Sequence, residues 1–183
     1  LAGATATACQ PLAGVEAFRV ELELEEGPVC VTGAEYVSEL HAVVLALRSG
    51  EIVVYPLAAC VPGSPAGEES VPECVGCIQE GIHSMAWAPD QELVVFGTGA
   101  GTLVTMTKEW DLIVENTVLP GLAGPALLPM NVRWRTDGQY YAVASVSVED
   151  GSSHRIGLWD RNGTFRGEVG ADPVHHRPLP GGL

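Results

Sequence analysis

Four side chains of this 183-residue chain have types that could together bind a metal ion. Cys74 and Cys77 form a C-x-x-C pair, and Cys60 and His83 lie near them in the sequence. Thiolates and imidazoles are preferred zinc ligands, but structural zinc sites usually combine two such pairs. Only one pair is present, in a stretch rich in Pro and Gly, so Cys74 and Cys77 are weak metal candidates. We predict free thiols there, with no bound metal and no cofactor.

Three glycines with a G-x-G-x-G spacing, Gly97, Gly99 and Gly101, resemble a phosphate-binding loop. Such a loop needs a helix directly after it, because the helix N-terminus supplies the N–H groups that bind the phosphate. The run that follows, Thr102 to Thr107, is rich in β-branched residues and predicts a strand. The glycines therefore predict a hairpin turn.

Carboxylates could supply the acid and base of a glycosidase. Asp90 and Asp137, however, occupy equivalent positions of an internal repeat, where an aspartate accepts backbone N–H bonds in a turn. Asp160 follows Trp159 in the W-D dipeptide that is typical of propeller strands. No Ser/His/Asp or Cys/His arrangement is recognisable by its spacing. We predict that the chain is not an enzyme and has no catalytic residue.

The elements that position these residues are short apolar runs separated by turn residues. Between Gly81 and Glu115 the sequence predicts four strands: Ile82–Trp87, Glu92–Gly97, Thr102–Thr107 and Asp111–Glu115. Four antiparallel strands in about 35 residues have nearly the size of one propeller blade, which takes about 40–45 residues in WD-type repeats.

The unit recurs along the chain, as a four-stranded sheet with two faces to bury requires. Trp134 and Asp137 repeat Trp87 and Asp90 at an offset of 47 residues, and Trp159 repeats Met106 at an offset of 53. An upstream hairpin ends with Tyr55 in the place of Met106. Six residues are therefore predicted to be structural residues of the blade core: Trp87, Asp90, Trp134, Asp137, Trp159 and Asp160.

These patterns predict an all-β chain that forms a partial WD-type β-propeller of about three blades. We expect a weakly ordered start with one or two strands over 1–34 and blades over 35–170. Stretches rich in Pro and Gly predict loops at 58–80 and 116–131, and a disordered tail at 171–183. Three blades are too few for a closed ring, which takes about four to eight.

Charge and cysteine usage limit the possible partners and compartments. The chain has 23 acidic and 9 basic residues and a net charge of −14, which disfavours direct binding of nucleic acid. No apolar run has the length of a membrane span. Five cysteines without a disulfide spacing favour a reducing compartment, and we predict a cytoplasmic protein. The start at Leu1, without a methionine, is interpreted as a fragment boundary.

Three segments together resemble one known family. They are H-S-M-A-W-A-P-D-Q-E-L-V-V-F-G-T-G-A-G-T-L-V-T-M-T-K-E-W-D-L-I-V-E, V-R-W-R-T-D-G-Q-Y-Y-A-V and I-G-L-W-D-R. The sequence is similar over about residues 35–166 to the first WD-type propeller of the large scaffold subunit of the Elongator complex, the IKAP family. The specific part is Ser84 to Glu115. The family carries a longer segment between Glu115 and Val132, and extends far beyond this chain.

The resemblance implies a non-catalytic scaffold fragment of Elongator, which modifies the wobble uridine of certain transfer RNAs. It implies contacts with the catalytic acetyltransferase subunit and with the second WD-repeat subunit, and contact with transfer RNA only through the complex. No membrane contact is implied, and the nucleus is a second location besides the cytoplasm. Two alternatives stay open: an interaction propeller of another WD-repeat complex, and a β-propeller enzyme with catalytic groups facing the centre of a closed ring.

Overall fold

The chain consists of β-strands and turns throughout the residues that the computed structural model describes, which are 4–8, 18–22, 30–56, 72–118, 127–147 and 154–169. The strands are β1 (Ala4–Ala8), β2 (Phe18–Leu22), β3 (Val31–Val37), β4 (Ala42–Leu47), β5 (Glu51–Pro56), β6 (Glu73–Cys77), β7 (Ile82–Trp87), β8 (Leu93–Thr98), β9 (Thr102–Thr107), β10 (Leu112–Thr117), β11 (Leu127–Trp134), β12 (Tyr140–Ser147), β13 (His154–Asp160) and β14 (Phe165–Val169).

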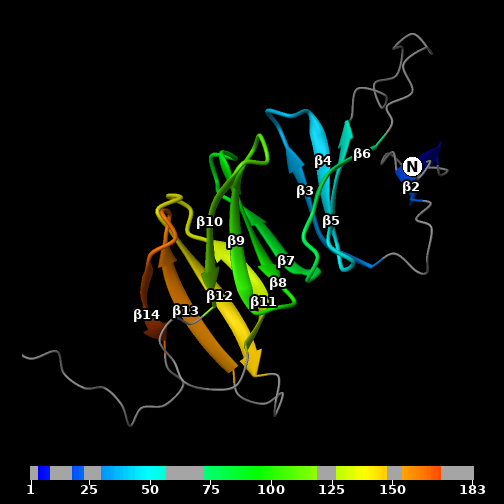
Figure 1. The fold of residues 1–183 in the computed structure, drawn as a ribbon. Coiled ribbons are helices and arrows are strands. Elements are labelled where there is room, and N and C mark those ends of the chain that lie inside the picture. Colours follow the sequence, from blue (N-terminus) through cyan, green and yellow to red (C-terminus); the bar gives the residue numbers. More distant parts are fainter. Residues whose placement is uncertain are drawn as a thin grey trace, which may run out of the picture. The chain divides into compact units, whose positions relative to one another are not determined.

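The chain divides into two compact units, Leu1–Gly81 and Ile82–Leu183. The first unit holds the two-stranded sheet β1–β2 and a four-stranded antiparallel sheet in the order β3–β4–β5–β6, which we name the first blade. Alternate residues of β4, such as Val44 and Ala46, are fully buried. Figure 1 shows these four strands as one twisted sheet.

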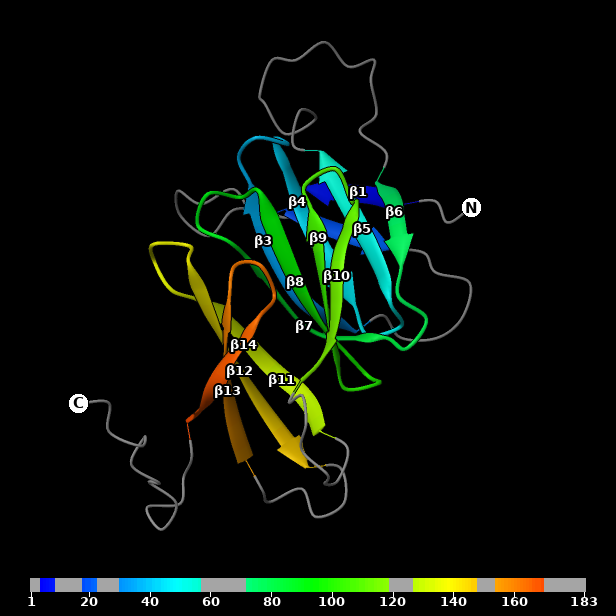
Figure 2. The same ribbon diagram turned by 60° about the vertical axis from the view of Figure 1, so that its left-hand side comes forward.

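The second unit holds two further four-stranded sheets, the second blade (β7–β10) and the third blade (β11–β14). Within each blade every strand pairs with the strand that precedes or follows it in the sequence, so each blade is an antiparallel meander. Strand β11 of the third blade lies beside β7 and β8 of the second blade, and Figures 1 and 2 show the two sheets face to face.

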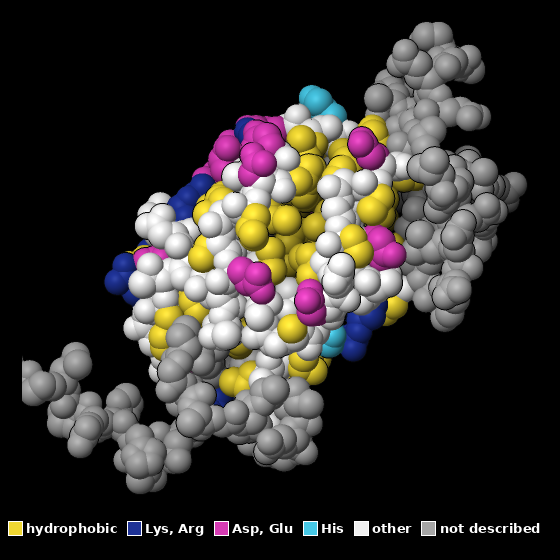
Figure 3. All heavy atoms as spheres, in the orientation of Figure 1, with side chains coloured by type: hydrophobic (Ala, Val, Ile, Leu, Met, Phe, Trp, Pro, Cys, Tyr) yellow, Lys and Arg dark blue, Asp and Glu magenta, His cyan; other side chains and the backbone are white. Residues whose placement is uncertain are grey.

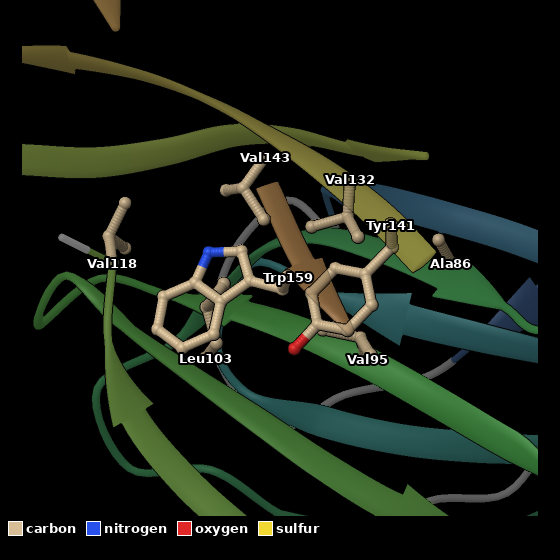
Figure 4. Packing of buried hydrophobic residues seen from close by; sticks show 8 residues of the cluster. All are labelled: Ala86, Val95, Leu103, Val118, Val132, Tyr141, Val143 and Trp159. Atoms are coloured by element: carbon tan, nitrogen blue, oxygen red, sulfur yellow. The ribbon is translucent and has the colours of Figure 1, made fainter. Parts of the chain in front are cut away.

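The core of the second unit lies between these two sheets. Alternation along β12 turns Tyr141, Val143 and Ser145 to the buried side, as expected for a strand with one covered face. Figure 4 shows Tyr141 and Trp159 side by side among aliphatic side chains of both blades. The buried cluster consists of Ala86, Val95, Leu103, Val118, Val132, Tyr141, Val143 and Trp159. Burial raises the pKa of Tyr141 to about 12, so its phenol is neutral at physiological pH.

The prediction of an all-β partial propeller is confirmed. The described residues form three four-stranded blades, fewer than the four to eight of a closed ring. The predicted strands Ile82–Trp87 and Thr102–Thr107 have the observed bounds, and the other two strands of the second blade differ from the prediction by one or two residues at their ends.

The structure differs from the sequence prediction at both predicted internal loops. Strand β6 lies inside 58–80, and parts of β10 and β11 lie inside 116–131. Proline misled the prediction because it is tolerated at sheet edges and bulges. Pro72 directly precedes β6, an edge strand, and Pro129 lies at a bulge of β11, also an edge strand. Residues 58–71 and 119–126 of these stretches and the tail 171–183 lie outside the described residues.

Candidate interaction surface at the turn end of the second unit

Three aspartates, the repeated Asp90 and Asp137 together with Asp160, each close a turn at one end of a blade. Asp90 Oδ1 accepts a hydrogen bond from the backbone N–H of Glu92 at 3.2 Å, and Asp137 Oδ1 accepts one from Gln139 at 3.0 Å. Asp160 Oδ1 accepts two, from Asn162 at 3.0 Å and Thr164 at 2.8 Å. Asp90 and Asp137 thus stabilise their turns as predicted. An aspartate side chain can accept hydrogen bonds from backbone N–H groups that the pairing of strands leaves free.

One arginine joins these turns across the two blades. Arg161 follows Asp160 in the third blade, and its Nη2 lies 2.8 Å from Asp90 Oδ2 of the second blade. Its Nη1 donates a hydrogen bond of 3.2 Å to the carbonyl of Gly138. A Cβ atom at Gly138 would lie 3.3 Å from that nitrogen and 3.5 Å from Pro89 Cδ, so a small residue leaves room for the contact.

Further hydrogen bonds also cross from blade to blade. Trp134 Nε1 donates to the carbonyl of Ala86 at 3.2 Å, and Asn116 Nδ2 donates to the carbonyl of Gly163 at 2.9 Å. We name these two bonds and the Arg161–Asp90 ion pair the inter-blade clasp. The clasp fixes the relative position of the second and third blades and hence of the turns at this end, which we name the turn end.

The three turn aspartates have lowered pKa values, so they are charged at neutral pH. Burial acts to raise the pKa of Asp90, but the N–H of Glu92 and the Arg161 guanidinium outweigh it and lower the pKa. The pKa of Asp137 falls to about 2, chiefly because Arg135 donates hydrogen bonds to it. The pKa of Asp160 is also lowered, because hydrogen bonds from Thr164 and Arg166 outweigh the effect of burial.

A turn with a half-buried tryptophan adds apolar surface at this end. Trp110 has φ 71 in the turn between β9 and β10, and its ring meets the buried Trp87 edge to face at 5.9 Å. Thr107 Oγ1 fixes the turn by accepting hydrogen bonds from the N–H groups of Glu109 and Asp111. Both carboxylates are exposed. Figure 3 shows acidic side chains gathered at this end of the second blade.

The tryptophans that were predicted for the blade core differ in their burial. Trp87 and Trp159 are buried, at 5% and 1% exposure, whereas Trp134 is only half-buried. Trp134 nonetheless packs on Tyr141, with ring centroids 4.8 Å apart, and bonds to the second blade.

The weak metal candidates belong to the first unit. Cys74 and Cys77 are exposed free thiols on edge strand β6, and Cys60 lies outside the described residues. Burial, followed by the charge of Glu51, raises the pKa of the Cys77 thiol. Among the residues that the structure describes, no three His, Cys, Asp or Glu side chains are grouped to hold a metal ion.

The predicted hairpin of the glycine-rich segment is present. Gly101 has φ 77 and its N–H donates to the carbonyl of Thr98, after which β9 begins. The glycines therefore join two strands, and the N–H groups that a phosphate would need are not aligned at the start of a helix.

Sequence reasoning missed the clasp. The repeat places Arg161 at the position of Lys108, which pairs with Glu92 of its own blade at 2.9 Å. Only the packing of two blades shows that Arg161 reaches a neighbour. The arrangement as a whole consists of turns held by their own carboxylates and of charges held in pairs.

The Arg161–Asp90 pair gives a prediction about pH. A double-mutant cycle of Asp90→Asn and Arg161→Met is expected to give a coupling of about 0.2–1 kcal/mol in the free energy of unfolding at pH 7, because the pair is partly exposed. The folded pKa of Asp90 is depressed, so this stabilisation is present above the unfolded pKa of about 3.9 and is lost as pH falls through the folded value.

Urea denaturation at pH 7 and at about pH 2 measures the coupling. The pair Glu92–Lys108 is a matched control, because it lies within one blade. Equal couplings at both pH values would show that the charge of Asp90 does not stabilise the clasp.

In the described part of the chain, no helix has the length and apolar character needed to cross a membrane.

Three antiparallel four-stranded meanders, two of them packed face to face with aspartates in equivalent turns, define a β-propeller. Residues 7–123 match the sequence model of the ELP1 first N-terminal beta-propeller. The chain belongs to this family.

Similar proteins are found in animals and plants. The protein named Elongator complex protein 1 of Mus musculus is 30% identical over 173 residues, which is 75% of this chain and 12% of the mouse protein. The Arabidopsis thaliana protein of the same name is 25% identical over 150 residues, or 76% of this chain and 10% of that protein. This chain therefore spans only a small part of the length of these relatives.

Solved structures support the fold. The crystal structure of the Cps50 (Swd1) beta-propeller domain of Myceliophteria thermophila matches with a TM-score of 0.58 and 10% identity. The match covers 85% of this chain and 52% of the solved one.

Proposed function

We propose that this chain is a non-catalytic scaffold and interaction module of the Elongator complex, the assembly that modifies the wobble uridine of certain transfer RNAs. The observation that carries the proposal is the match of residues 7–123 to the ELP1 first N-terminal propeller, together with relatives that are named Elongator complex protein 1. Its expected partners are the catalytic acetyltransferase subunit and the second WD-repeat subunit. Its expected location is the cytoplasm, with the nucleus as a second location.

The charges of the described residues support a role in binding proteins. Asp90, Asp137 and Asp160 are engaged by backbone N–H groups and by arginines, so they are not poised to exchange protons with a substrate at neutral pH. The exposed Glu109 and Asp111 beside Trp110 offer acidic and apolar surface at the turn end. Transfer RNA contacts the module only through the rest of the complex, because a net charge of −14 repels phosphates.

Co-purification with tagged, full-length gene product tests the proposal. We expect both named subunits to be recovered with the wild-type protein. Reversing two exposed charges, Glu109→Lys with Asp111→Lys, should leave the abundance unchanged and reduce recovery of a partner several-fold, because both side chains lie on the surface. Recovery of a different WD-repeat assembly, without these subunits, would instead support the alternative function.

A second measurement concerns transfer RNA. We expect the isolated chain to bind transfer RNA no more tightly than about 1 μM in a mobility-shift assay at physiological salt, because like charges repel. A basic domain of similar size serves as the positive control. Tight binding that weakens steeply with added salt would contradict the proposed indirect role.

A further inference from the structure

Two exposed thiols of the first blade have no part in the proposed function. Cys74 and Cys77 are free cysteines of β6, the strand at the edge of that sheet (Figure 2). In a regular strand, residues three positions apart lie on opposite faces, because successive side chains alternate. A regular β6 would therefore hold the two thiols apart.

A bulge in β6 brings the two thiols to the same face. Cys74 lies opposite Val53 of β5. Cys77 lies opposite Glu51, because the register shifts between these pairs and Val75 is the extra residue of the bulge. Side chains of directly paired residues share a face, and Glu51 and Val53 lie on one face of β5 because they are two positions apart. Both thiols therefore point to that face.

Gly76 agrees with this assignment of faces. It lies opposite Ile52, and a Cβ atom added to it would be 3.7 Å from Ile52 Cδ1. Ile52 directly follows Glu51 in β5, so its side chain points to the other face. A side chain at position 76 would thus lie on the face away from Cys74 and Cys77.

The spacing of the two thiols suits one shared ligand. The residues opposite them are two positions apart in β5, which corresponds to about 6.8 Å between Cα atoms of a strand. Cys74 Sγ donates a hydrogen bond of 3.4 Å to the carbonyl of Gly76, so its side chain leans along β6 toward Cys77. The electrostatic effect of Cys74 on Cys77 agrees with this proximity.

This spacing favours a metal ion over a disulfide. Disulfides usually join Cα atoms about 4.4–6.8 Å apart, and this pair is at the upper end of that range. A disulfide holds its sulfur atoms about 2 Å apart, whereas two metal–sulfur bonds of about 2.3 Å let them lie as far as about 4.6 Å apart. A bridging ion therefore needs less movement of the backbone than a disulfide does.

The number of ligands decides which ion fits. Zinc does not fit the pair, because structural zinc sites use about four ligands and, among the described residues, no third His, Cys, Asp or Glu completes a group. Copper(I) is a soft ion that prefers thiolates, and two of them are sufficient for it. The negative charges of Glu51 and Glu80 act on Cys77 and favour a bound cation over a free thiolate.

We propose that Cys74 and Cys77 form a surface site for a soft monovalent cation, copper(I), held between the two thiolates. Binding releases the two thiol protons, forms two sulfur–copper bonds and transfers no electron. The site is independent of the proposed scaffold function, because β6 and its bulge supply both ligands.

Competition for copper(I) with the chromogenic chelator bicinchoninate, in the absence of oxygen, tests the proposal in the 183-residue chain. The starting protein carries Cys9→Ser, Cys30→Ser and Cys60→Ser, so that Cys74 and Cys77 are its only thiols. We expect it to withdraw one copper ion per chain from the chelator. A further Cys74→Ser or Cys77→Ser substitution should abolish this binding, because a single thiolate remains.

A variant with its thiols on opposite faces is the matched control. Gly76→Cys with Cys77→Ser, in the same background, keeps two thiols and brings them closer in the sequence, but one points to each face. There is room for the new side chain, since the nearest atom to a Cβ at Gly76 is Ile52 Cδ1 at 3.7 Å. We expect this variant to lose copper binding while its circular dichroism spectrum is unchanged.

Equal withdrawal of copper by this control would overturn the proposal, because a segment without fixed faces would bind through either pair of thiols. Failure of the starting protein to withdraw copper would also overturn it. So would an ion shared between two chains, seen as a copper-dependent dimer in size-exclusion chromatography. X-ray absorption that shows two sulfur neighbours per copper in the monomeric protein would support the site.

Discussion

Replacing Trp159 with alanine is expected to lower the free energy of unfolding of the second unit by about 3–5 kcal/mol. Its side chain is 1% exposed, its ring lies nearly parallel to that of Tyr141, and Phe165 meets it edge to face at 5.2 Å. Trp159 Nε1 has no hydrogen-bond partner among the described residues, so the loss comes from packing alone. Such a loss is a large part of the 5–15 kcal/mol that stabilises a typical domain.

Urea denaturation followed by circular dichroism measures the effect of Trp159→Ala. Trp159→Phe should cost clearly less, because it keeps an aromatic ring in the cluster, and Leu112→Ala should cost little, because Leu112 is 59% exposed. A loss below about 1 kcal/mol for Trp159→Ala, the size of a typical surface effect, would show that the two blades do not share one core.

Replacing Gly97 with valine should destabilise the second unit by about 1–3 kcal/mol or more, through overpacking. Gly97 lies in β8, where a Cβ atom would be 2.5 Å from Ser84 Oγ and 2.7 Å from Pro129 Cβ. Pro129 belongs to the third blade, and its carbonyl accepts a hydrogen bond from Ser84 Oγ at 3.5 Å. The side chain of valine would push the two sheets apart at this point of contact.

A series of Gly97→Ala and Gly97→Val, measured by thermal denaturation, should show a graded loss of stability. Gly76→Ala is the matched control in a strand of the first blade, where the nearest atom to a Cβ would be Ile52 Cδ1 at 3.7 Å. We expect the control to be nearly neutral or slightly stabilising, since alanine restricts the unfolded chain. If Gly97→Val left the stability unchanged, β8 and β11 would be less closely packed than they are in the structure.

The sequence predicted the strands of the second blade almost residue by residue because three local signals agree there. Apolar runs of strand length, Gly and Pro–Asp turns, and a repeat at a fixed offset all mark the same boundaries. Ile82–Trp87 and Thr102–Thr107 are examples. Where the signals disagree, as at Pro72 and Pro129, composition predicted a loop and the structure has an edge strand.

The contacts between blades could not be predicted from the sequence, for a different reason. A repeat shows that Asp90 and Asp137 are equivalent, but it does not show that one is held by Arg161 of the next blade and the other by Arg135 of its own. Likewise, nothing in the local sequence shows that Trp110 of a turn meets the ring of Trp87. These pairings depend on side-chain conformation and on the angle between sheets, which only the packed structure defines.

The meander order of the strands has a consequence for how the chain reaches its native state. Since each strand of the second and third blades pairs with its neighbour in sequence, every ladder can close over a short loop. Short loops lower the entropy cost of forming a contact, and local contacts are associated with rapid folding. Isolated hairpins form within about 1–10 μs, far faster than a ribosome adds residues, at about 5–20 per second. Each blade can therefore pair its strands as they emerge, whereas its second face is buried only when the next blade docks on it.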